Sequence, residues 1–171
     1  NKKSKIESAC FLKFNKKRSI SLETSFSNQY DAGGKNALVD GLRGPNNYLT
    51  GRWQGFYGED FESIVDLGSK EPVTYLNIGA IQHVRSWIWL PKKVEFLASN
   101  DGKIFKSIGT LMHSVSDNSS ESIIKQFELK LKTPLETRYI KVRAENYGKC
   151  PEWHLGSGGT SWLFFDEITI L

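Results

Sequence analysis

The segment "RYIKVRAE", residues 138–145, carries the pattern that decides the fold. Its apolar residues Ile140, Val142 and Ala144 alternate with longer polar or aromatic side chains. Successive side chains of a β-strand point to opposite faces of the sheet, so this alternation indicates a strand with one face buried. The segment therefore predicts a half-buried strand in an antiparallel sheet.

The same period-two pattern recurs along most of the chain, and helical periodicity is nearly absent. Turn signals separate the strands, above all "SNDGK" at 99–103, which places Asp-Gly between two strand-like runs. Many short antiparallel strands without helices between them predict an all-β fold, a jelly-roll β-sandwich. The other predicted strands are "FESIVDLG" (61–68), "VTYLNIGA" (73–80), "KKVEFLAS" (92–99), "KIFKSIGTL" (103–111), "QFELKLK" (126–132) and "FFDEITIL" (164–171).

Length and composition suit one domain. The chain has 171 residues and is rich in aromatics, with ten Phe, six Tyr and five Trp. It has no apolar run long enough to span a membrane, and "NKKSKI" at the start is no signal peptide. Residues 1–23 have a different character, with strands around a basic turn, and are either an edge strand or the remnant of a preceding small β domain. Residues 24–171 are predicted to form the module itself.

Charge and cysteines limit the partners. The net charge is +4, and the basic clusters at 16–18 and 92–93 are short, which favours solvated turns over a nucleic-acid site. Cys10 and Cys150 form no C-x-x-C pair, so a cysteine zinc site is not expected. A disulfide between them and two unrelated free thiols both remain open.

Three segments are too long and too aromatic to be plain connections: 41–60, 81–93 and 145–159. They hold four of the five tryptophans, two of the three histidines, and arginines. A sugar offers an apolar face for an aromatic ring and hydroxyls for Arg, Asn, Glu or His. These loops therefore predict a shallow carbohydrate site.

Each ring in these loops could instead belong to the core, which is the commoner place for a tryptophan in a β-sandwich. Trp162 is predicted to be core, and at least one of Trp87 and Trp89 is expected to pack inward. Trp53 and Trp153 lie in loops rich in glycine and proline and are expected to be exposed.

The histidines and acidic residues add further candidates. His83 and Arg85 alternate onto one side of their segment and could face one pocket, whereas His154 could bind a hydroxyl or only fix its loop. Asp40 in an Asp-Gly turn and the pair Asp166 and Glu167 near the end of the chain offer hard oxygen ligands of the kind that calcium prefers.

Five stretches, taken in order, resemble the discoidin, or coagulation-factor type C, superfamily. The likeness is to family 32 carbohydrate-binding modules, and more narrowly to those at the C-terminal end of Bacteroides-type β-N-acetylhexosaminidases and chitobiases. The stretches are "YDAGGKNALVDGLRG", "GRWQGF", "DFESIVDLG", "VEFLASNDGKIF" and "TRYIKVRAENYGKCPEWHLGSGGTSWLFFDEI".

The resemblance implies a structural calcium ion and a sugar site in the loops at one end. The implied calcium ligands are Ala37, Asp40, Thr50 and Glu167, although "LRGPNNYL" separates Thr50 from the Asp-Gly turn. The implied glycans contain galactose, N-acetylgalactosamine or N-acetylglucosamine. The candidate residues for sugar binding are Trp53, His83, Arg85, Trp87, Asn146, Trp153 and His154.

We therefore expect a non-catalytic module attached to a bacterial glycoside hydrolase that is secreted, periplasmic or at the cell surface. Its partners are a glycan and the catalytic domain of the same chain, and neither nucleic acid nor a transmembrane segment is expected. The alternative is a structural spacer whose aromatic loops pack on that catalytic domain. Catalysis by the module is disfavoured because Glu59, Asp60 and Glu152 form no convincing carboxyl pair.

Overall fold

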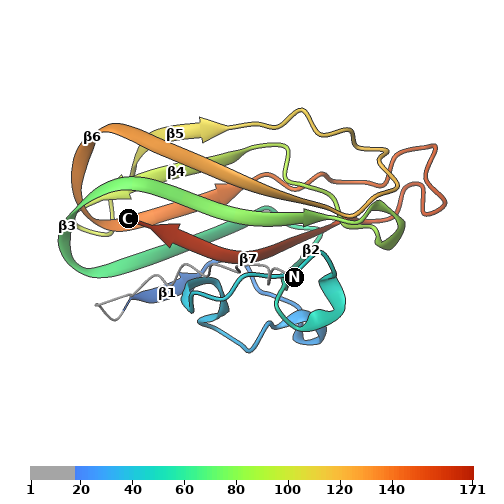
Figure 1. The fold of residues 1–171 in the computed structure, drawn as a ribbon, viewed down its shortest axis with the longest axis horizontal. Helices are drawn as coiled ribbons and strands as arrows, with labels where there is room; N and C mark the ends of the chain where they lie inside the picture. Colours follow the sequence, from blue (N-terminus) through green and yellow to red (C-terminus); the bar gives the residue numbers. More distant parts are fainter. Residues whose placement is uncertain (1–17) are drawn as a thin grey trace, which may run out of the picture.

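Two antiparallel β-layers face each other in the computed structural model, which describes residues 18–171 (Figure 1). The predicted all-β sandwich is confirmed. The short 3-10 helices are η1 (Asn28–Tyr30), η2 (Ala37–Val39), η3 (Tyr48–Thr50) and η4 (Val84–Ser86). The strands are β1 (Ser19–Leu22), β2 (Gln54–Tyr57), β3 (Phe61–Gln82), β4 (Val94–Ser99), β5 (Lys106–Leu111), β6 (Ile123–Ala144) and β7 (Trp162–Ile170).

Strands β3 and β6 each belong to both layers. Residues 61–66 of β3 pair with residues 139–144 of β6, whereas residues 75–82 pair with residues 123–130. Both strands bend between these halves, at the same end of the sandwich (Figure 1). One layer therefore has the order β2-β7-β3-β6 and the other the order β1-β3-β6-β4-β5.

The alternating residues fill the space between the layers. Ile140, Val142 and Ala144 are buried, as their spacing predicts. The stretches 61–68 and 73–80, predicted as separate strands, are the two halves of β3, joined through a shift in register between Asp66 and Glu71. A strand that bends keeps both halves in the sheet while it changes layers.

Strand β1 is an edge strand of the second layer. Within residues 18–171 it pairs with β3 alone, and Ile20 packs into the main core with 3% of its surface exposed. Residues 19–22 therefore belong to the sandwich. The alternative prediction, the remnant of a preceding small β domain, falls mostly on residues 1–17. These residues, which include Cys10, lie outside the described part of the chain. Cys150 is buried, and burial raises the pKa of its thiol.

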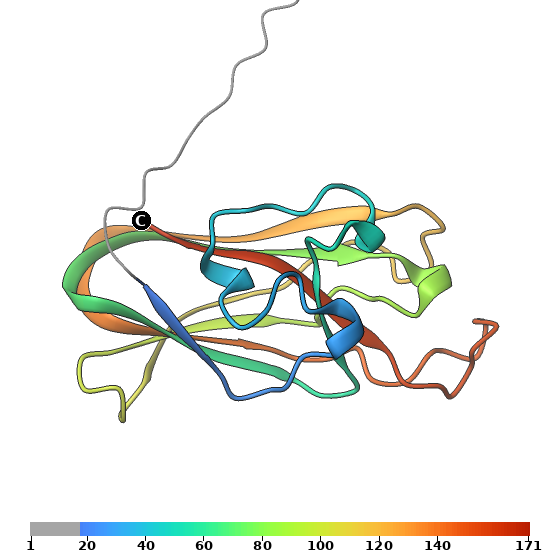
Figure 2. The ribbon, with the colours of Figure 1, turned by 90° about the horizontal axis from the view of Figure 1, so that it is seen from below.

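The two ends of the sandwich differ. The loops after Gln82, Leu111 and Ala144 leave from one end, which we call the loop end. Ser19 and Leu171 lie at the opposite end, close to the bends of β3 and β6 (Figure 2). No helix among residues 18–171 has the length and hydrophobicity that a membrane span needs.

Candidate functional site

A hollow of about 510 Å³ opens at the loop end. Three loops form it: residues 83–88, 112–122 and 145–161. Its lining includes Arg85 and Trp87 from the first loop, Asn118 and Ser120 from the second, and Trp153 and Leu155 from the third. Two other hollows, of about 380 and 410 Å³, have no tryptophan in their lining. The hollow at the loop end is therefore the candidate ligand site.

Apolar side chains at this hollow are open to solvent. Trp153 is 51% exposed, as predicted, and the neighbouring Leu155 is fully exposed. Trp87 is half-buried. A large exposed ring beside a concave surface is unusual in a soluble domain unless it contacts a partner or ligand.

His154 joins two of the three loops. Its Nε2 lies 3.0 Å from the carbonyl oxygen of Val84, and its Nδ1 accepts a hydrogen bond of 3.0 Å from the backbone N–H of Gly156. Because Nδ1 accepts, Nε2 carries the proton and donates to Val84. The imidazole also lies edge-on to Trp87, Trp89 and Trp153. Of the two roles left open for His154, the structure shows the one that fixes its loop.

The glycine turn at 156–159 makes room for the indole of Trp87. A Cβ atom at Gly156 would lie 2.4 Å from that ring, and one at Gly159 would lie 2.6 Å from it. The backbone of Trp87 adopts a left-handed conformation, with φ of 64°. Strain of this kind in a non-glycine residue is often found at functional sites.

Trp89 lies outside the lining of the hollow but contacts two of the loops that form it. It is buried, stacks on Tyr147 at 5.0 Å, and its Nε1 donates to the carbonyl oxygen of Asp117. The prediction that at least one of Trp87 and Trp89 packs inward is confirmed. Trp89 thereby ties the 112–122 loop to the other two.

Trp53, in contrast, does not have the exposure predicted for it. It is fully buried with Ile81, Ile88 and Phe164, and its Nε1 donates to the carbonyl oxygen of Pro45 at 2.9 Å. A Cβ at Gly44 would lie 2.2 Å from the indole, so the glycine lets the backbone lie on the ring. The Gly-Pro sequence therefore cradles this ring. Trp162, predicted to be core, is half-buried beside the same cluster.

The structure separates three other candidates. Arg85 lines the hollow, but His83 packs against Tyr48, with 5.1 Å between ring centroids. Asn146 is 6% exposed, and its side chain bonds the backbone of Glu59 and Gly148. Asn146 thus fixes the base of the 145–161 loop, and His83 and Asn146 both lie outside the lining of the hollow.

Asn118, Ser120 and Leu155 line the hollow although the sequence did not single them out. Asn118 and Ser120 come from a polar loop without aromatic residues, which gives no local sign of a site. Leu155 directly follows the candidates Trp153 and His154. Its position in the same loop was the one sequence feature that could have indicated a place in the site.

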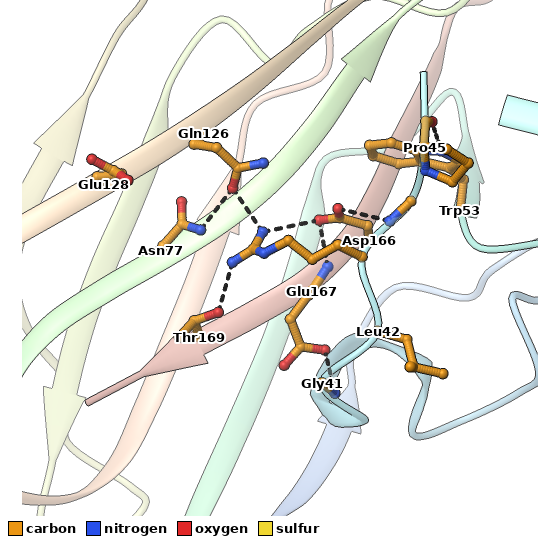
Figure 3. A network of polar contacts seen from close by, with 12 residues as sticks. Gly41, Leu42, Pro45, Trp53, Asn77, Gln126, Glu128, Asp166, Glu167 and Thr169 are labelled. Atoms are coloured by element: carbon orange, nitrogen blue, oxygen red, sulfur yellow. Dashed lines mark hydrogen bonds and ion pairs between the residues drawn. The ribbon is translucent and has the colours of Figure 1, made fainter. Parts of the chain in front are cut away.

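The acidic candidates lie elsewhere, where the segment 40–44 meets strand β7; Figure 3 shows Asp166 and Glu167 on that side of the strand. The backbone N–H of Gly41 donates to Oε2 of Glu167 at 3.0 Å, and that of Gly44 donates to Oδ2 of Asp166 at 3.1 Å. The guanidinium of Arg43 lies 3.5 Å from Oδ1 of Asp166. This segment is therefore held on β7 by two carboxylates and one arginine.

Arg43 also donates hydrogen bonds to two uncharged side chains. It donates to Oε1 of Gln126 and to the hydroxyl of Thr169, each at 2.7 Å (Figure 3). Asn77 donates to the same oxygen of Gln126. The stretch "LRGPNNYL", which separates Thr50 from the Asp-Gly turn, thus supplies a cation, Arg43, that bridges β7 and β6.

The pKa of Glu167 is strongly shifted by its surroundings. Its pKa is raised to about 8, mainly by burial and also by the charges of Asp40 and Asp166, while the N–H of Gly41 and the charge of Arg43 act in the opposite direction. Burial also raises the pKa of Asp166. Three carboxylates here face one guanidinium, which favours either a proton or a cation.

The donor set fits calcium in part. Asp40 uses Oδ1 to accept from Leu42, and Glu167 uses Oε2, so within residues 18–171 each carboxylate keeps one oxygen outside these bonds. Ala37 is the first residue of η2, and Asp40 is the C-cap of that helix. No cluster of three or more His, Cys, Asp or Glu suited to a metal occurs within the described residues, so backbone carbonyls would have to complete the shell.

Thr50 does not join this set through its side chain. It lies exposed in η3, and its hydroxyl donates to the carbonyl oxygen of Asn47 at 3.1 Å. The residues inserted after the Asp-Gly turn form this separate 3-10 helix, and its cap takes up the hydroxyl. The hydroxyl proton of Thr50 is thus directed to Asn47 and not to Asp40 or Glu167.

The layered fold and the hollow at its loop end define a discoidin-like β-sandwich module. The family model described as the F5/8 type C domain matches residues 21–163, and the chain belongs to this family. No curated protein sequence matches the chain.

Solved structures of family 32 carbohydrate-binding modules share the fold. The module of NanJ from C. perfringens, solved with galactose, aligns with a TM-score of 0.54 at 15% identity, over 90% of this chain and 92% of that one. A GH31 module bound to GalNAc aligns with a TM-score of 0.56 at 13% identity, over 90% and 96%. The AlyQ module, solved with 4,5-unsaturated mannuronic acid, gives 0.54 at 12% identity, over 90% and 93%. At these identities the likeness shows the fold alone.

Proposed function

We propose that this chain is a non-catalytic carbohydrate-binding module and that the hollow at the loop end binds galactose or an N-acetylhexosamine within a glycan. The observation that carries the proposal is the exposed indole of Trp153 in the lining of a hollow of about 510 Å³. A volume of this size accommodates a small sugar. The galactose and GalNAc in the two similar structures support this ligand class.

The chemistry of the lining suits a sugar. Trp153 offers an apolar face for C–H groups, and Arg85, Asn118 and Ser120 offer polar groups for hydroxyls. Each such hydrogen bond contributes only about 0.5–1.5 kcal/mol because water competes for it. We therefore expect a dissociation constant in the micromolar to millimolar range, which is weak binding.

Attachment to an enzyme makes weak binding useful. Leu171 lies at the end opposite the hollow, so a domain joined there would leave the hollow open (Figure 2). We infer that the parent is a bacterial glycoside hydrolase of the β-N-acetylhexosaminidase or chitobiase type, acting outside the cytoplasm. Tethering then raises the local concentration of glycan around the catalytic domain.

The positions of the carboxylates support a non-catalytic role. Among the described residues, no Asp or Glu lines the hollow. Asp60 accepts from the backbone N–H of Asn146, which makes it part of the loop framework. A glycosidase needs two carboxyl groups that flank its substrate.

Titration calorimetry with methyl galactoside and GalNAc tests the proposal. We expect binding by the 171-residue chain and a loss of at least about 10-fold for Trp153→Ala. The matched control is Tyr57→Ala, since Tyr57 is also aromatic and 50% exposed but lies outside the lining. Absence of binding to any sugar would favour the spacer alternative, in which Trp153 and Leu155 pack on the catalytic domain.

We also propose a structural calcium ion bound by Asp40, Glu167 and the Ala37 carbonyl. Its support is the charge balance, because three buried or neighbouring carboxylates face the single guanidinium of Arg43. A divalent cation would favour the ionised form of Glu167, balance the carboxylate charge and tie η2 to the last strand.

A further inference from the structure

The polar groups of the hollow are mostly hydrogen-bond donors. Arg85 is exposed, and no described residue forms an ion pair or hydrogen bond with its guanidinium. Oδ1 of Asn118 already accepts from the hydroxyl of Ser116 at 2.7 Å, which leaves the amide N–H groups free. His154 uses one nitrogen to donate to Val84 and the other to accept from Gly156, so its ring adds no acceptor.

Acceptors are correspondingly scarce. No carboxylate within residues 18–171 lines the hollow, so no lining side chain balances the charge of Arg85, and the side-chain acceptors are the hydroxyl of Ser120 and the second lone pair of Asn118 Oδ1. The hydroxyl groups of a neutral sugar can accept from the guanidinium of Arg85 but bring no charge that balances it. A carboxylate or sulfate ester only accepts, and its bond to a guanidinium is charge-assisted and stronger than a neutral one.

From this imbalance we propose that the hollow selects glycans with an anionic substituent. The charged group, a carboxylate or a sulfate ester, binds the guanidinium of Arg85, and the apolar face of the sugar ring lies on Trp153. The inference rests on the proposed sugar site and adds its ligand class. Planar, two-pronged contact between guanidinium and carboxylate gives orientation as well as affinity.

The test compares matched sugars on the same 171-residue chain by titration calorimetry at pH 7. Methyl galacturonide is compared with methyl galactoside, and GalNAc 6-sulfate with GalNAc, so that the carboxylate and the sulfate are measured separately. We expect at least one acidic sugar to bind about 10-fold more tightly than its neutral partner, and we expect added salt to reduce the difference.

Three variants locate the effect. Arg85→Gln removes the charge and is expected to abolish the preference, while Arg85→Lys keeps the charge and retains part of it. Lys132→Gln is the control, because Lys132 is exposed in the bend of β6, at the end away from the hollow. It makes the same change in net charge and is expected to leave the preference intact.

The outcomes separate this inference from the proposed function. Equal binding of neutral and acidic sugars, unaffected by Arg85→Gln, would overturn the inference and leave the sugar site standing. Preference that survives Arg85→Gln, or that Lys132→Gln removes equally, would also overturn it. Failure of every sugar to bind would overturn both.

Discussion

The Nε2 atom of His154 lies 3.0 Å from the carbonyl oxygen of Val84, and this bond holds the loop of Trp153 against the loop of Arg85. Trp153 and Arg85, the two side chains proposed to bind the ligand, therefore depend on a buried imidazole between their loops. The imidazole is 9% exposed, so water does not readily replace the bond.

We expect His154→Ala to weaken sugar binding about 10-fold, because the two loops would no longer hold one geometry. We also expect it to lower the free energy of unfolding by about 1–2 kcal/mol through the unpaired Val84 carbonyl. Urea denaturation and titration well below the unfolding temperature measure the two effects. Full affinity in a destabilised variant would show that His154 supports the fold without shaping the hollow.

Trp53 is expected to matter for stability alone. Trp53→Ala removes a fully buried indole and its bond to Pro45, and should cost about 3–5 kcal/mol. Trp153→Ala removes a half-exposed ring and should change stability by less than about 1 kcal/mol. Denaturation curves of the two variants test this contrast, which similar losses of stability would contradict.

The glycine turn gives a third prediction. Gly156→Ala places a Cβ 2.4 Å from the indole of Trp87, so the ring must move and the hollow must change shape. We expect lower affinity for sugar, on the order of 10-fold, and a shifted tryptophan fluorescence maximum. Ser157→Ala, one residue further along the exposed turn, is the matched control and should alter neither.

Calcium should stabilise the wild-type chain. A bound ion at 100 times its dissociation constant adds about 2.7 kcal/mol to the free energy of unfolding. Thermal unfolding with millimolar calcium and with EGTA measures the shift. Asp40→Asn should reduce the response, whereas Thr50→Ala should leave it intact because the Thr50 hydroxyl bonds Asn47. An equal unfolding temperature with and without calcium would contradict the calcium proposal.

Stability should fall on mild acidification through His113. Burial lowers the pKa of His113 from its ordinary 6.5, and the nearby charge of Lys125 lowers it further, against hydrogen bonds with the backbone of Pro91 and Val115. The unfolded chain then takes up a proton before the folded chain does, so the free energy of unfolding falls as the pH decreases through about 6.5. Phe127 also packs on this ring.

His113→Gln removes this contribution. The difference in unfolding free energy between wild type and variant should therefore change between pH 7.5 and pH 5.5, with wild type relatively weaker at the lower pH. Urea denaturation at several pH values measures the difference, which isolates His113 from the other titrating groups. A difference that is constant with pH would show that His113 has no role in this dependence.

The strands were predictable because their signal is local. Ile140, Val142 and Ala144 alternate within five residues, and one buried face is enough to produce that pattern. The arrangement in layers was not readable in the same way, because β3 and β6 each change layers midway and their pairing joins residues as distant as Phe61 and Ala144.

The site was predicted at the level of loops rather than residues. Trp53 and Trp153 lie in similar Gly- and Pro-rich sequence, yet one is buried under Gly44 and Pro45 and the other is exposed. Only the tertiary path of the loop distinguishes them. Asn118 reaches the hollow because β5 ends at the loop end, which depends on strand order and not on the residues near Asn118.

The most direct test of the sugar site is an NMR titration that follows the five tryptophan indole N–H signals. Methyl galactoside, GalNAc and methyl galacturonide are each added to the 171-residue chain. If the hollow binds sugar, the chemical shifts of the Trp87 and Trp153 indole N–H signals change with added sugar, while that of the buried Trp53 does not. Unchanged indole signals at saturating concentrations of all three sugars would contradict the account.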